Sequence, residues 1–179
     1  ITHIVKGLSV NSKYILKEIQ VADNYVLAKD IDFTVNNTTD IQNVKMIDKQ
    51  VTIEKVNTKG ETVEGAFLQV VDKSGKIIDK WVSGKTSHYV TGLREGEKYT
   101  LVEIYAPTGY VKAKSTDFTV TYDKRTQKVE IIDKVVSMIK TDIAENRIEG
   151  AEMTVTNEAG EIVDSWTSTN EPHHISGLE

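Results

Sequence analysis

Three ionisable side chains occupy core-facing positions in segments that alternate as β-strands do. Residues i and i+2 of a strand share a face, so Lys55 shares its face with Val51 and Ile53. Asp133 ends a second such segment, and Glu103 lies in a third. Burying isolated ions is costly. We therefore expect the three side chains either to meet or to lie at strand ends just outside the core.

If these groups meet, their environment favours a condensation reaction. Desolvation favours the neutral amine on Lys55 and the neutral acid on Asp133 and Glu103. In that state the amine can attack the carboxyl carbon of Asp133, while Glu103 transfers protons and water leaves. The product is an intramolecular isopeptide bond. Two alternatives stay open, namely an unreacted buried ion cluster and three unconnected strand caps.

The same residue types recur 85 positions apart without a gap. The recurrence assigns partial copies of the site, with Glu18 and Asp48 in an earlier unit and Lys140 in a later one. Glu18 shares its face with Tyr14 and Leu16. Its counterpart Glu103 is therefore assigned to the core-facing side of its strand. Other matched positions are Gly7-Leu8, Gly92-Leu93 and Gly177-Leu178; Phe33 and Phe118; Gly75 and Gly160; Trp81 and Trp166; and His3, His88 and His173.

The period divides the chain into three parts. Residues 1–50 are the C-terminal part of one repeat, 51–135 are a complete repeat, and 136–179 are the N-terminal part of the next. Only Lys49-Gln50 and Lys134-Val135 separate the units, so we expect neighbours to be stiffly coupled. The half-units indicate either a window from a longer array, which we favour, or halves that complete one another between chains.

The complete repeat reads as strands throughout. Turn signals such as 57–60, 72–75, 94–97 and 106–109 separate the β-rich runs. Thr52 and Glu54 take the solvated face of the first run. We predict an all-β fold of tandem small antiparallel β-sandwiches. The expected strands are 51–56, 66–71, 76–82, 98–105, 117–121 and 128–133.

Composition excludes several classes of protein. The 179 residues carry a net charge of −5, which argues against nucleic-acid binding, and no run approaches a membrane span. The absence of cysteine excludes disulfides, zinc–thiolate sites and cysteine nucleophiles. His88 and its two counterparts are expected to pack rather than to bind metal, and Trp81 to lie in the core. We expect no metal, no cofactor and no enzymatic turnover.

Several motifs together resemble a known family. Tyr99-Thr-Leu-Val-Glu103 is followed by Ala106-Pro-Thr-Gly-Tyr110, and Val51-Thr-Ile-Glu-Lys55 and Val129-Glu-Ile-Ile-Asp133 flank the unit. This pattern resembles the collagen-adhesin B-type repeats (CnaB-like, SpaA-like) of Gram-positive surface proteins and pilins. The resemblance implies a transthyretin-like (prealbumin-like) fold, with Lys55 as nucleophile, Asp133 as electrophile and Glu103 as the assisting acid.

Two positions depart from the family pattern. The commoner acceptor is Asn, where this chain has Asp133 and Asp48. The loop at 20–25 also differs from 105–110, although Asn24 can supply the left-handed conformation expected at Gly109.

These observations predict a structural role. We expect a stalk or shaft repeat of an extracellular, cell-surface or cell-wall-attached adhesin or pilus-like protein, giving mechanical and proteolytic stability. Its partners would be adjacent repeats of the same or a neighbouring chain, and any chemistry would be a single self-catalysed isopeptide bond. The alternative is an adhesin module that binds a host extracellular protein or glycan.

Overall fold

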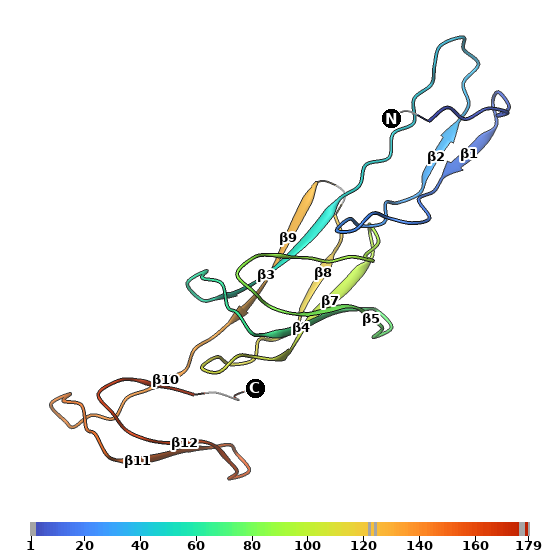
Figure 1. Ribbon diagram of the computed structural model, residues 1–179. Helices are drawn as coiled ribbons and strands as arrows, with labels where there is room; N and C mark the ends of the chain where they lie inside the picture. Colours follow the sequence, from blue (N-terminus) through green and yellow to red (C-terminus); the bar gives the residue numbers. More distant parts are fainter. Residues whose placement is uncertain (1–2, 122, 124, 176–177, 179) are drawn as a thin grey trace.

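The computed structural model describes residues 3–121, 123, 125–175 and 178, and within them it contains strands and turns but no helix. Figure 1 shows three bodies arranged end to end. Gly177, the third copy of the repeated Gly-Leu turn, lies outside the described residues. None of the described elements is a helix that could cross a membrane.

The middle body is a two-layer sandwich of seven strands, here called the central sandwich. They are β3 (Gln50–Asn57), β4 (Phe67–Asp72), β5 (Ile77–Val82), β6 (His88–Tyr89), β7 (Lys98–Tyr105), β8 (Thr116–Thr119) and β9 (Thr126–Asp133). One sheet has the order β6-β3-β9 and the other β5-β4-β7-β8. The predicted all-β sandwich is therefore confirmed, and the short β6 is the strand that the sequence pattern did not reveal.

Alternation places the apolar side chains between the two sheets. In β9 every second residue from Val129 to Asp133 is buried, and β7 buries Tyr99, Leu101 and Glu103 in the same way. The core is made by Val26 of the N-terminal segment together with Val51, Ile53, Ala66, Leu68, Val70, Val90, Leu93, Tyr99, Leu101, Phe118, Val120, Val129 and Ile131.

Two details of the central sandwich differ from expectation. The sheets are not wholly antiparallel, because the first and last strands, β3 and β9, run side by side in the same direction. Thr52 was expected on a solvated face, but it is only 7% exposed. Because β3 is the middle strand of its sheet, Thr52 has a cross-strand neighbour on each side, Tyr89 of β6 and Lys128 of β9.

The flanking bodies contain fewer strands. The N-terminal segment (residues 3–48) holds the hairpin of β1 (Lys13–Leu16) and β2 (Ile31–Thr34). The C-terminal segment (residues 136–175) pairs β11 (Glu152–Thr156) with β12 (Ile162–Thr167), and β10 (Ser137–Met138) with β13 (His173–His174).

These flanking hairpins have the registers of their counterparts in the central sandwich. Tyr14 lies opposite Phe33 just as Tyr99 lies opposite Phe118. The pair β11–β12 carries a register irregularity after Val155, and β4–β5 carries one after Val70. The 85-residue spacing seen in the sequence thus also relates local pairings in the structure.

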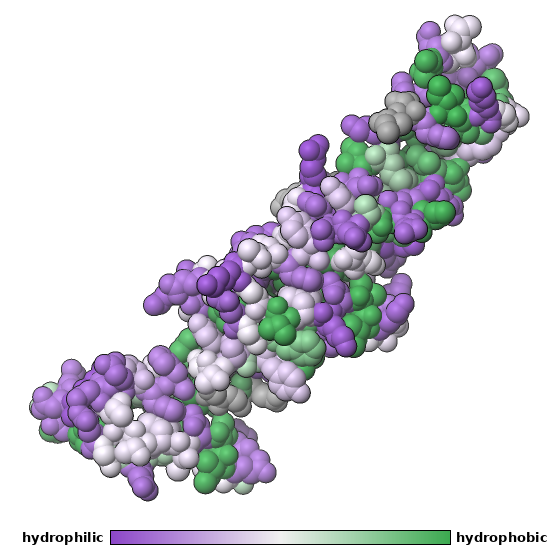
Figure 2. Space-filling model, in the orientation of Figure 1, coloured by the Kyte–Doolittle hydropathy of each residue, from purple (hydrophilic) through white to green (hydrophobic). Residues whose placement is uncertain are grey.

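The flanking segments expose residues that the central sandwich buries. Val90 is fully buried, whereas the corresponding Val5 is 62% exposed. Figure 2 shows hydrophobic residues at the surface of both flanking segments, and also on the middle body. Each flanking segment therefore lacks some of the strands that close the sandwich, while its remaining pairs correspond to parts of the central sheets.

Candidate crosslinking site

Lys55, Glu103 and Asp133 meet inside the central sandwich. Lys55 enters from β3 and Asp133 from the neighbouring β9, while Glu103 enters from β7 of the opposite sheet. All three are almost completely buried, with Lys55 4%, Glu103 1% and Asp133 0% exposed. Two layers of structure thus supply one cluster of charges.

The parallel register explains why Lys55 and Asp133 are neighbours. Lys55 lies opposite Ile131, and Asn57 lies opposite Asp133. Because side chains two residues apart share a face, Lys55 and Asp133 are diagonal neighbours on the core side of the same sheet.

The contacts within the cluster are direct. The Nζ of Lys55 donates a hydrogen bond to Oδ1 of Asp133 and lies 3.3 Å from Oε1 of Glu103. The other carboxylate oxygen of Glu103, Oε2, accepts a hydrogen bond of 2.5 Å from the backbone N–H of Ala113. One lysine nitrogen therefore lies beside two acids, one of which is also held by the main chain.

The protonation of the cluster follows from its burial. With every group ionised it would carry a net charge of −1 away from water, which is unfavourable. Burial raises the pKa of Asp133 to about 7; the Lys55 ammonium opposes this shift and the Glu103 carboxyl adds to it. Oε1 of Glu103 and Oδ2 of Asp133 accept no hydrogen bond from the described residues. A proton held by these carboxyls would neutralise the cluster.

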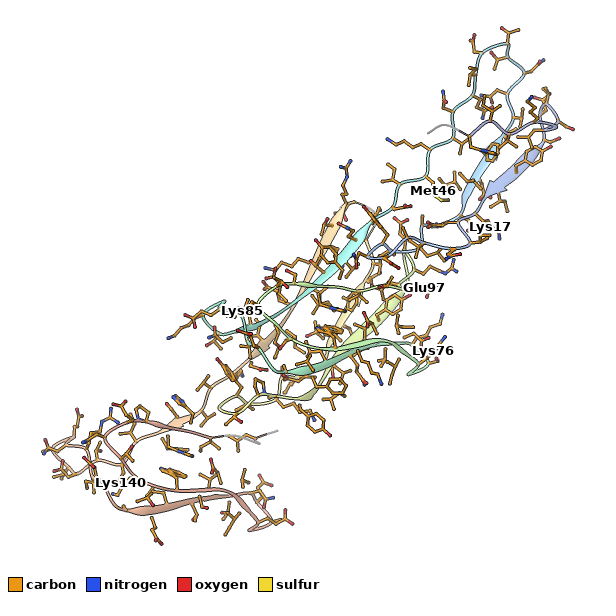
Figure 3. All side chains as sticks on the ribbon, viewed as in Figure 1. Lys17, Met46, Lys76, Lys85, Glu97 and Lys140 are labelled. Atoms are coloured by element: carbon orange, nitrogen blue, oxygen red, sulfur yellow. The ribbon has the colours of Figure 1, made fainter. Side chains whose placement is uncertain are left out.

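The partial sites lie in the flanking segments. Glu18 and Asp48 are half-buried in the N-terminal segment, and Lys140 is half-buried in the C-terminal segment. Figure 3 shows Lys140 at the opposite end of the molecule from Met46, which lies two residues before Asp48. The structure therefore brings together only the set at 55, 103 and 133, among the residues that it describes.

The repeated histidine and tryptophan pack against each other. The ring of His88 stacks on Trp81 with centroids 4.1 Å apart, and its Nε2 lies 2.8 Å from Oδ2 of Asp79. Trp81 is partly buried against the core. His173 and Trp166 repeat this arrangement in the C-terminal segment. Within the described residues, no three His, Cys, Asp or Glu side chains are grouped to hold a metal ion.

A family model matches the central sandwich. Residues 49–135 match the SpaA family, described as a prealbumin-like fold domain. These residues form a SpaA-type prealbumin-like domain. The resemblance found in the motifs is thereby confirmed, and the buried Lys–Glu–Asp cluster lies wholly within this SpaA-like domain.

Solved structures from bacteria are similar to the chain at low identity. The Bacillus anthracis TIE protein is 23% identical over 93% of this chain and 35% of its own, with a TM-score of 0.42. A streptococcal ancillary pilin is 17% identical over 94% of this chain and 63% of its own, with a TM-score of 0.44. The shaft pilin SpaA of Lactobacillus rhamnosus GG is 17% identical over 72% of this chain and 66% of its own, also with a TM-score of 0.44.

The chain thus spans about a third of the first of these proteins and under two thirds of the second. No curated protein sequence matches the chain.

Proposed function

We propose that the SpaA-like domain is a load-bearing module of an extracellular surface stalk or pilus-like shaft, crosslinked by an amide bond between Lys55 and Asp133. The observation that carries the proposal is the buried cluster linking the first and last strands of the domain through the Lys55–Asp133 contact. A covalent bond there connects the two ends of the fold.

The reaction follows from the charges in the cluster. A proton passes from the Lys55 ammonium to a carboxylate, which leaves a neutral amine beside a protonated Asp133. The amine nitrogen forms a bond to Cγ of Asp133, Glu103 accepts a proton from that nitrogen and passes it to the departing hydroxyl, and the Cγ–O bond breaks to release water. The buried Lys55–Asp133 ion pair becomes a neutral amide, and Glu103 is regenerated.

This chemistry acts once on the protein itself. The product bond stays in the fold, so no substrate turns over. The role we propose is therefore mechanical, with adjacent repeats as the partners and the bacterial cell surface as the place of action. None of the described features favours the ligand-binding adhesin alternative, which stays a prediction.

Intact-mass measurement of the 179-residue chain tests the bond. We expect a mass about 18 Da below that of the sequence, because condensation removes one water. Lys55→Met should restore the plain mass. Asp133→Asn should lose ammonia instead and give the same final mass as the crosslinked parent, because both reactions make the same amide. A parent mass equal to that of the plain sequence would falsify the proposal.

A further inference from the structure

The loop between β1 and β2 contacts the next body of the chain. At residues 26–28, three consecutive backbone N–H groups bind three different parts of the molecule. Val26 donates to the carbonyl of Lys49, at 2.8 Å, and Leu27 donates to the carbonyl of Leu93, at 2.9 Å. Ala28 donates to Oε2 of Glu18, also at 2.8 Å. This tripeptide therefore ties its own unit, the linker and the following domain together.

The same three bonds recur at the other end of the SpaA-like domain. Val111 donates to the carbonyl of Lys134 at 2.8 Å, and Lys112 donates to the carbonyl of Leu178 at 3.2 Å. Ala113 donates to Oε2 of Glu103 at 2.5 Å. Each residue lies 85 positions after its counterpart in the first joint. Because two sequence-distinct loops make one pattern, the contacts belong to the architecture of the repeat.

Burial and charge strengthen the first joint. Val26 is 1% exposed and belongs to the hydrophobic core of the following domain. Oε2 of Glu95 accepts a hydrogen bond of 3.2 Å from the N–H of Lys29, and Oε1 of Glu95 forms an ion pair with Lys49. The Glu95 N–H in turn donates to the carbonyl of Leu27, at 3.1 Å. The loop is thus held by both the linker and a turn of the next domain.

A residue in the left-handed backbone conformation precedes each tripeptide by two positions. Gly109 has φ of 88°, and Asn24, its counterpart, has φ of 68°. This left-handed turn suits Gly and, among other residues, Asn. The predicted equivalence of Asn24 and Gly109 is confirmed, so the two different loop sequences approach their joints with the same backbone turn.

We propose that the site glutamate is also a positioning residue for the joint between units. Oε1 of Glu103 faces Lys55, while Oε2 fixes Ala113 and thereby the tripeptide that docks the next unit. Within these 179 residues Glu18 holds Ala28 with no counterpart of Lys55 beside it, so the joint can be tested apart from the amide bond. Where the bond forms, as proposed above, crosslink and joint share one side chain.

Glu18 allows the joint role to be tested apart from the crosslink. In Glu18→Ala of the full chain, we expect hydrogen exchange at the amides of Val26 and Leu27, followed by NMR, to accelerate about tenfold, since a charged acceptor is lost. Glu18→Gln should restore slow exchange, because its amide oxygen can still accept from Ala28. Lys17→Ala is the matched control, as its side chain is 57% exposed. The loss of one water, relative to the mass of each variant's own sequence, should persist in all of them.

Two results would overturn the proposal. One is unchanged exchange at Val26 and Leu27 in Glu18→Ala, and the other is equal acceleration in Glu18→Gln. If Glu18→Ala instead loses protection throughout β1 and β2 because its segment unfolds, the test is repeated with Glu103→Ala and Glu103→Gln, measuring amide hydrogen exchange at Val111 and Lys112. Only the alanine variant should then exchange fast.

The mass of the Glu103 variants separates this inference from the proposed function. Glu103→Gln should keep the joint but lack the loss of water, because an amide cannot transfer protons as a carboxylic acid does. Complete loss of water in that variant would count against the assisting role of Glu103 and leave the joint role standing. Fast exchange at Val111 in both variants would count against the joint role alone.

Discussion

At the scale of single residues, Asp133 decides what the cluster can do. A carboxyl with an ordinary pKa would be ionised at neutral pH and would resist attack by an amine. Burial raises the pKa of Asp133 to about 7, so the protonated acid is available under physiological conditions. In the crosslink we propose, the surrounding sandwich, rather than the residue type, would make this aspartate the acceptor.

The raised pKa predicts an unusual pH dependence in an uncrosslinked variant. In Lys55→Met the ammonium that opposes the shift is absent, so the pKa of Asp133 stays raised. Between about pH 4 and 7 the folded state then binds more protons than the unfolded state, and stability falls as the pH rises through the folded value. We expect the free energy of unfolding in urea to drop by about 1–3 kcal/mol from pH 5 to pH 8.

The double variant Lys55→Met/Asp133→Asn is the control for this titration. It keeps the other ionisable groups and removes the one whose shift is at issue. A flatter pH profile in the double variant is expected. Identical slopes for the two variants would show that Asp133 is not the group responsible.

At the scale of elements, the two sheets are connected at one edge by aromatic and polar contacts. β5 and β6 are edge strands of different sheets. His88 from β6 stacks on Trp81 from β5 and contacts Asp79 of the same strand. The equivalent residues of the C-terminal segment, which has fewer strands, keep a centroid distance of 4.2 Å. The contact therefore also forms in a segment that holds only the β3–β6 part of the unit.

We expect His88→Ala to weaken this edge without touching the crosslink. Losing the stack and the hydrogen bond should lower the free energy of unfolding by about 1–2 kcal/mol, measured in urea on the Lys55→Met background. Lys85→Ala, whose side chain is 82% exposed, should change it by less than about 0.5 kcal/mol. The parent carrying only His88→Ala should still show the loss of one water relative to its own sequence. Equal stabilities of the His88 and Lys85 variants would contradict the role given to the stack.

At the scale of the whole molecule, the position of the proposed crosslink would determine how tension passes along the chain. Lys55 and Asp133 are 78 residues apart in sequence yet adjacent in the parallel pair β3–β9. A bond between them would carry force directly from the first strand to the last. The rest of the domain would then lie outside the loaded path.

Stretching single molecules by their ends tests this arrangement. Without the bond, as in Lys55→Met, unfolding of the domain should release about 260 Å of chain, at ~3.4 Å per residue. The parent should show no extension step of that length. An equal step in both proteins would mean that the domain is not bridged between these residues.

Sequence alone determined the members of the site and the class of fold. Strand alternation has a period of two residues, so local pattern placed Lys55 and Asp133 on the core side, and the 85-residue repeat resolved Glu103 by comparison with Glu18. The same pattern located most strands of the central sandwich, because the alternation of buried and exposed side chains along a strand can be read from neighbouring residues.

Only the tertiary structure decided how distant segments meet. The parallel pairing of β3 with β9, the burial of Thr52 beneath its neighbours and the two-residue strand β6 all depend on contacts between residues far apart in sequence. So do the joints at residues 26–28 and 111–113, whose backbone N–H groups bind carbonyls of other units. Main-chain hydrogen bonds are nearly independent of residue type, and therefore leave little trace in the sequence that makes them.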